Sequence, residues 1–183
     1  MPVVADLAAT AMLVVFAVAL VAKSRSAMAF DDFAASLSQF GINSVRRQRL
    51  AAGGVLIVEA TSCAGLLLLG HHPVVRFALP VLLLAFFALA IGLSAHRGQV
   101  TACHCFGTSA TLPTRPHIVM NCGLALLGCL AMTSHPVDGS AGDAVLGIGL
   151  GLIVGILFAS SADLYVALST APPAPVSRPR RES

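Results

Sequence analysis

The chain has 183 residues, of which 57% are hydrophobic and only 10% are charged, with a formal net charge of +3 at pH 7. Soluble domains carry about 25% charged residues, so this composition excludes an ordinary soluble enzyme and a disordered chain. The small and scattered positive charge also argues against a nucleic-acid partner. The composition indicates an integral protein of the cell membrane, with the lipid bilayer as its solvent.

Five apolar segments have the composition of membrane-spanning helices, which need about 20 residues each. In chain order they are Val3–Ala22, Leu50–Gly70, Phe77–Ser94, Ile118–Thr133 and Ala144–Ala167, and the fourth is short. Positive charge follows the first segment instead of preceding it, which is opposite to a cleaved secretory signal, so we interpret this segment as a retained span. The sequence therefore predicts an all-α, multi-pass bundle with a four-helix core and a fifth span.

The segment between the first two spans has a different pattern. Apolar residues recur at helical spacing in residues 27–41, which predicts a short amphipathic helix in the membrane interface. We expect residues 1–133 to form the four-helix membrane domain, including this helix and a loop at residues 97–117. The additional span falls within residues 134–167, and a disordered basic tail is expected over residues 168–183.

Positively charged residues are distributed very unevenly between the two predicted sides of the membrane. The chain has 11 Lys and Arg residues, and only Arg76 falls on one side. The other side receives Lys23, Arg25, Arg46, Arg47, Arg49, Arg97, Arg115, Arg178, Arg180 and Arg181. Because positively charged loops stay in the cytoplasm, we expect the N-terminus outside and the C-terminus inside.

The loop between the third and fourth spans contains a Cys-His-Cys-Phe-Gly sequence, residues 103–107. A disulfide between Cys103 and Cys105 would close a tight ring that is easily reduced, which suits thiol–disulfide exchange better than structural bracing. Nearby histidines and arginines stabilise a thiolate, so His104 is expected to tune the pair, and Gly107 lets the backbone turn away after it. Two alternatives remain open: idle thiols, or a copper or zinc site built from Cys103, Cys105 and a histidine.

An acidic residue, Glu59, interrupts the second span. A charge at mid-span costs about 2.5–3.5 kcal/mol on insertion scales, so Glu59 is expected to face the bundle interior and to have a partner. Glu59 would accept a proton from thiol chemistry or from a bound quinone; the alternative is a protonated Glu59 hydrogen-bonded to Asn121 or a serine. We do not expect Lys23 to be the partner, because it follows the first span near the cytoplasmic interface.

The chain contains 5 cysteines, an odd number, so at least one is unpaired within the chain. At about 1.5 Å per residue, Cys63 lies about 20 Å and Cys129 about 18 Å from the cytoplasmic ends of their spans. Cys122 lies nearer the Cys103/Cys105 loop, so a stepwise thiol relay across the membrane is one hypothesis. The alternative, which we favour, is that these three cysteines are small apolar packing residues.

The loop with Cys103, Cys105, Phe106 and Gly107 resembles the CxCFG-type motif of the MauE/DoxX-like family of redox-associated membrane proteins. The likeness extends over about residues 5 to 133. Its other marks are Lys23 after the first span, Phe40-Gly41 at the end of the following helix, Glu59 in the second span and Asn121 early in the fourth. The chain departs from the family pattern in its fifth span and in the histidine between the cysteines.

The resemblance implies a membrane protein that exchanges electrons with a thioredoxin-like partner during maturation of the methylamine dehydrogenase β-subunit. Cys103 and Cys105 would then be the exchanging pair. The alternatives are a non-catalytic assembly factor or complex subunit and a metal-handling membrane protein. Separately, Gly147, Gly151 and Gly155 form a small-residue stripe in the fifth span, which predicts close helix packing within the bundle or in a homo-oligomer.

Overall fold

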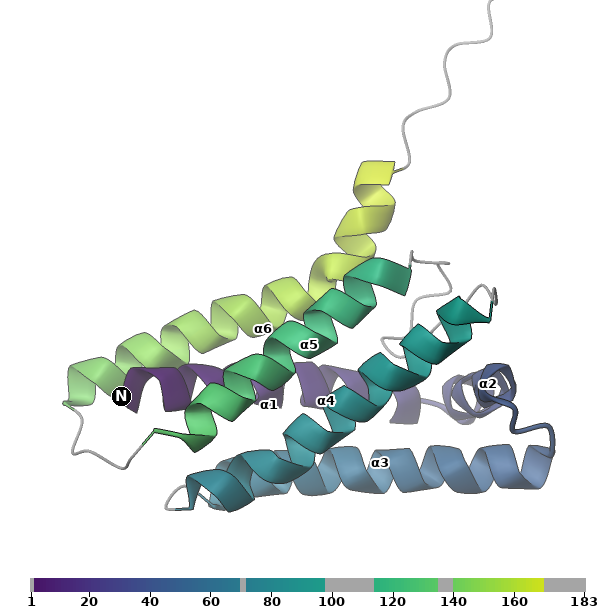
Figure 1. The fold of residues 1–183 in the computed structure, drawn as a ribbon, viewed down its shortest axis with the longest axis horizontal. Coiled ribbons are helices and arrows are strands. Elements are labelled where there is room, and N and C mark those ends of the chain that lie inside the picture. The colour runs from purple at the N-terminus through teal and green to yellow at the C-terminus, as the bar shows by residue number, and fades with distance from the viewer. Residues whose placement is uncertain (1, 70–71, 98–113, 135–139, 170–183) are drawn as a thin grey trace, which may run out of the picture.

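The computed structural model describes residues 2–69, 72–97, 114–134 and 140–169, and within them all regular structure is helical. The elements in chain order are α1 (Pro2–Ser24), α2 (Ala27–Ser36), the 3₁₀ turn η1 (Leu37–Phe40), α3 (Val45–Leu68), α4 (Pro73–His96), α5 (Thr114–Met132) and α6 (Ala141–Ser169). Figure 1 shows the five long helices running alternately in opposite directions. The predicted all-α bundle is therefore confirmed.

The lengths of the helices match a bilayer in four of the five cases. In α1, α3, α4 and α6 there are stretches of 20 to 24 residues that are apolar enough to cross a membrane, whereas the apolar part of α5 is the shorter segment His117–Met132. The short fourth span expected from the sequence is thus present as a helix. This helix begins at Thr114, so the loop expected at residues 97–117 ends earlier than predicted.

The first helix lies at the centre of the bundle and contacts every other long helix. Its buried residues recur at intervals of three and four, which places them on one face. They are Ala8, Ala9, Ala11, Met12, Val15, Phe16, Ala19 and Lys23. The apolar members of this stripe up to Phe16 form the main core with Leu66 of α3, Phe77 and Leu84 of α4 and Leu124 of α5.

The last helix packs along the first half of α1. The predicted glycine stripe faces α1: a Cβ atom built on Gly147 would lie 2.8 Å from the carbonyl oxygen of Val3, and one on Gly151 would lie 2.7 Å from that of Leu7. These distances leave no room for a side chain, so the two backbones approach as closely as glycine allows. The stripe therefore serves packing within the chain, and a homo-oligomer would need another face of α6.

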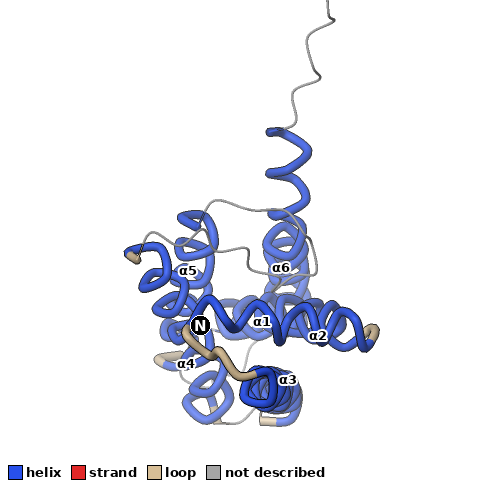
Figure 2. Tube along the Cα trace, turned by 90° about the vertical axis from the view of Figure 1, so that its right-hand side faces the viewer, coloured by secondary structure: helices blue, strands red, loops and turns tan. Residues whose placement is uncertain are grey.

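The helix expected between the first two spans is present as α2 followed by η1. It runs across the bundle instead of along it (Figure 1, Figure 2). The hydroxyl of Ser26 caps α2 by accepting a hydrogen bond of 3.0 Å from the Ala29 N–H, and Gly41, with φ of 85°, ends η1.

The apolar face of α2 and η1 packs on protein. Phe33, Ala34 and Leu37 are buried against Ala52 of α3. A helix in the membrane interface would place its apolar face among lipid headgroups. Here the first turns of α3 extend beyond the end of α1, and the apolar face of α2 covers them.

Candidate functional site

A buried ion pair lies in the middle of this apolar bundle. The Nζ of Lys23, near the end of α1, donates a hydrogen bond to Oε1 of Glu59 in α3. The two residues are only 2% and 1% exposed. An isolated charge in such surroundings is very costly, so each of these residues stabilises the charged form of the other.

The expectation that Lys23 lies too far from Glu59 is therefore wrong, and the reason is geometrical. Val45 is the first residue of α3. At the rise of an α-helix, Glu59 lies about 21 Å further along the helix axis. The start of α3 extends past the end of α1, and α2 fills the space beyond Lys23. The end of α1 is therefore covered by protein, and Lys23 is not exposed there.

Two aromatic rings complete the surroundings of the ammonium group. Its Nζ lies 4.8 Å from the ring centroid of Phe33 in α2 and 5.7 Å from that of Phe87 in α4. Both distances fall within the range of a cation–π interaction. Lys23 thus joins α1 to α3 through the carboxylate and to α2 and α4 through aromatic faces.

A small cavity of about 30 Å³ lies beside the ion pair. Its walls come from α1, α3, α4 and α5, and its polar lining residues are Lys23, Glu59, His117 and Asn121. The structure thus brings Asn121 near Glu59, as the sequence suggested. The remaining lining residues are apolar: Val15, Phe16, Ala19, Leu84, Phe87 and Ile91.

One oxygen of the buried carboxylate has no partner among the described residues. Oε1 of Glu59 binds Lys23, whereas Oε2 is buried without a hydrogen bond. A buried acceptor without a partner costs about 1–3 kcal/mol, and more when it is charged. Such a group within a lined cavity is the strongest indication of a functional site in the described part of the chain.

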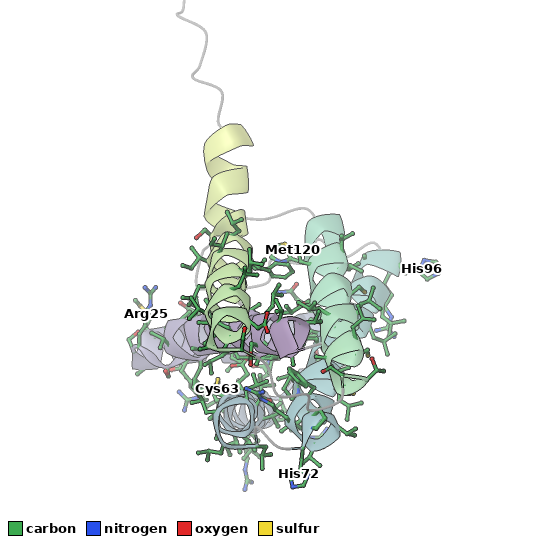
Figure 3. The ribbon with its side chains drawn as sticks, turned by 90° about the vertical axis from the view of Figure 1, so that its left-hand side faces the viewer. Arg25, Cys63, His72, His96 and Met120 are labelled. Carbon is green, nitrogen blue, oxygen red and sulfur yellow. The ribbon has the colours of Figure 1, made fainter. Side chains whose placement is uncertain are left out.

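The predicted cysteine pair cannot be placed in this geometry. Cys103, His104, Cys105, Phe106 and Gly107 lie outside the described residues, in the connection between α4 and α5. What the structure does describe is the two helices on either side of that connection. His96, the last residue of α4, is exposed and points away from the bundle (Figure 3), whereas His117 of α5 lines the cavity.

The other three cysteines are free thiols in different surroundings. Cys63 lies one turn after Glu59, is partly buried and packs against the main core; Figure 3 shows it on the side of α3 that faces the bundle. Cys122 and Cys129 are seven residues apart on α5 and both are exposed at the outside of the bundle. The relay hypothesis needs these thiols to approach one another, and their exposure on the outer face of α5 offers no support for it.

Phe33, Phe87 and His117 were not predicted from the sequence as parts of this site, and Lys23 was wrongly excluded as the partner of Glu59. A signal for Lys23 was available, because it continues the buried stripe of α1, four residues after Ala19 and seven after Phe16. Glu59 likewise continues the buried stripe of α3 with Ala52, Ser62 and Leu66. Two opposite charges on the buried faces of neighbouring spans are best explained as partners.

Within the described residues, no group of three or more His, Cys, Asp or Glu side chains is arranged to hold a metal ion. The metal alternative concerned Cys103, Cys105 and a histidine, and these cysteines lie outside the described residues.

Comparison with known proteins gives one match. The family model described as methylamine utilisation protein MauE matches residues 1–134, which include α1 to α5 and the ion pair but not α6. No curated protein and no solved structure matches the chain.

Proposed function

The chain belongs to the family of methylamine utilisation protein MauE, and on this basis we propose that it is a membrane thiol–disulfide redox protein. Cys103 and Cys105 are the proposed exchanging pair, and a thioredoxin-like protein is the proposed partner. The proposed role is the maturation of the methylamine dehydrogenase β-subunit, a disulfide-rich protein.

The observation that carries this proposal is the position of the polar site relative to the cysteine-bearing connection. That connection joins α4 to α5, and both helices contribute walls to the cavity beside Lys23 and Glu59. Buried ionisable groups in membrane spans are rare and are typical of charge and proton pathways. A site of this kind, lined in part by the two helices that flank the cysteine-bearing connection, supports a chemical role over purely structural bracing.

The proposed exchange proceeds in two displacement steps. The thiolate of one cysteine of the pair attacks a sulfur of the partner's disulfide, forms a mixed disulfide and releases the partner's other sulfur as a thiolate. The second cysteine then attacks the mixed disulfide, which forms the Cys103–Cys105 disulfide and leaves the partner as a dithiol. Two electrons pass to the partner, whose two thiolates take up the two protons that the pair released; the reverse sequence oxidises the partner.

The orientation of the chain is also part of the proposal. Of the 11 Lys and Arg residues, Lys23 is buried and Arg76 is alone on one side of the bundle. The other nine follow the ends of α1, α4 and α6 or lie in the first turns of α3 and α5, where they mark the cytoplasmic side. The N-terminus is then outside, and the cysteine pair faces the cytoplasm. Electrons would enter or leave the protein on that side.

The proposal is tested by Cys103→Ser and Cys105→Ser, expressed in a host that makes methylamine dehydrogenase. We expect the β-subunit to accumulate without its full set of disulfides, as seen by thiol labelling, and the single remaining cysteine to trap a mixed disulfide with the thioredoxin-like partner. Cys129→Ser, an exposed position on α5, is the matched control and should leave maturation unchanged.

Two other outcomes would contradict the redox proposal. If Cys103→Ser leaves the disulfides of the β-subunit intact but weakens its association with the membrane, the chain is an assembly subunit. If the purified wild-type protein carries about one equivalent of copper or zinc that Cys103→Ser removes, the chain handles metal.

A further inference from the structure

The cavity beside Glu59 is suited to water. To hold one water molecule, a cavity needs roughly 10–15 Å³ of solvent-accessible volume. The water molecule also needs two to four polar partners. The cavity next to the ion pair has about 30 Å³. Apolar cavities stay empty, but this one is lined by a carboxylate, an ammonium group, an imidazole and an amide.

The unpartnered oxygen of Glu59 shows where such water would bind. Oε2 is buried, lacks a hydrogen bond within the described part of the chain, and belongs to a residue that lines the cavity. Another wall is formed by α5, where His117 and Asn121 are four residues apart and therefore share one face of the helix. A water molecule between these walls gives Oε2 the donor that the protein does not.

We infer that this cavity is a water-filled proton-exchange site, in which one or two water molecules link Oε2 of Glu59 to Asn121 and His117. The inference does not depend on the chemistry of Cys103 and Cys105. Its ligands are water and a proton, and its protein groups are contributed by three different helices, α1, α3 and α5.

The groups that face the cavity define how a proton would move. The titratable groups are Lys23 of α1, Glu59 of α3 and His117 of α5; the walls from α4 are apolar, and α2 contributes only the ring of Phe33 beside Lys23. In its imidazolium form His117 would give a proton to a water molecule as that water gives one to Oε2 of Glu59. One N–H bond breaks and one O–H bond forms, which leaves a neutral imidazole and a neutral carboxyl group. The ammonium group of Lys23 lies beside the rings of Phe33 and Phe87.

The polar groups of this site lie at different depths in the bundle. His117 lies in the first turn of α5, at the end of the bundle where α4 ends and α5 begins, and Asn121 lies one turn deeper. Glu59 lies deeper still, beyond the first turns of α3. The polar groups thus form a series that leads from one end of the bundle to its buried centre.

The presence of water in the cavity is tested by hydroxyl-radical footprinting of the full-length protein in lipid nanodiscs. An X-ray pulse generates the radicals from bound water. Phe87 lines the cavity and is expected to be labelled, whereas Phe77, which is buried away from it, is the internal control and should remain unlabelled. Asn121→Leu, which fills the cavity with apolar atoms, should remove the labelling of Phe87. Equal and negligible labelling of Phe87 and Phe77 in the wild-type protein would overturn the inference.

Proton exchange is tested by infrared spectroscopy of the same nanodiscs after a rapid change of pH. The carboxyl signal that is absent from Glu59→Gln identifies Glu59. His117→Phe should slow its response roughly tenfold, which corresponds to about 1.4 kcal/mol in the barrier. His96→Phe, at an exposed position, is the matched control. A response that is equally fast in His117→Phe and in the wild-type protein would show that the water does not serve proton exchange.

Discussion

The two halves of α1 pack in different ways. The first half lies against the glycines of α6, with Gly151 so close to Leu7 that no side chain fits between them. The second half ends in Lys23, a buried charge held by a carboxylate and two aromatic rings. One helix thus carries an interface made of close backbones and an interface made of polar groups.

The two interfaces of α1 contribute to the bundle in different ways. Lipid tails are as apolar as leucine, so the α1–α6 interface gains stability mainly from close van der Waals packing between small residues. The polar interface gains little from burying two charges, but it accepts only one arrangement of α1 against α3, because any other leaves a charge without a partner. The first interface holds the helices together, and the second fixes their register and provides reactive groups.

The largest expected effect comes from removing one member of the ion pair. Glu59→Leu leaves Lys23 charged, buried and unpaired, and should destabilise the bundle by about 3–5 kcal/mol, as measured by unfolding in detergent. The double variant Lys23→Met/Glu59→Leu replaces both charges with apolar side chains and should regain most of that stability. A single variant as stable as the wild-type protein would show that the pair does not fix the packing of α1.

A smaller effect is expected at the glycine interface. Gly151→Leu forces α6 away from α1 and should cost about 1–3 kcal/mol, the usual range for overpacking. Gly149→Leu is the matched control, since a Cβ atom built on Gly149 has no neighbour within 4 Å. If the two variants unfold at the same denaturant concentration, α6 does not depend on its glycines to pack against α1.

Removal of one aromatic ring beside Lys23 should have a still smaller effect. Phe33→Leu keeps the apolar contact of α2 with α3 but removes the cation–π interaction, which contributes about 0.5–2 kcal/mol. The loss of stability caused by Phe33→Leu should also be measured in the Lys23→Met variant. There it is expected to be smaller, because no cation remains beside the ring. An identical loss in both backgrounds would indicate simple packing.

The smallest effect is expected on the surface. Arg49 of α3 forms a bidentate ion pair of 2.8 Å with Asp31 of α2, but both side chains are about half exposed. Exposed pairs contribute about 0.2–1 kcal/mol, so Asp31→Asn should change the unfolding transition little. A loss as large as that of Glu59→Leu would mean that α2 is held mainly by this contact and not by Phe33 and Leu37.

Much of the fold could be predicted from the sequence, because each helix carries its own signal. Hydrophobic length indicated the spans, the spacing of apolar residues indicated α2, and Gly147, Gly151 and Gly155 indicated close packing of α6. The ends of the helices were less predictable, since α3 begins at Val45 and α5 at Thr114, among polar residues that hydrophobicity does not register.

The site was harder to predict, because it depends on how far one helix extends past another. Glu59 was identified from its cost in a membrane, but its partner Lys23 was placed at the membrane surface by counting along α1 alone. The covering of Lys23 by α2 is a tertiary feature that such counting cannot reveal. Asn121 was identified by resemblance and as an alternative partner of Glu59. Phe87 was not identified, since an aromatic residue in an apolar span carries no signal of its own. His117 lies just before the predicted fourth span, where nothing in the sequence connects it with Glu59.

Thiol labelling can determine whether Cys103 and Cys105 form a redox-active pair. In a variant with Cys63, Cys122 and Cys129 all changed to Ala, the two remaining thiols are labelled in permeabilised cells before and after reduction, and the shift in mass is compared. We expect part of the protein molecules to be labelled at Cys103 and Cys105 only after reduction. This fraction should grow when the thioredoxin-like partner is supplied in its oxidised form. Complete labelling of both thiols without reduction, with or without the oxidised partner, would contradict it.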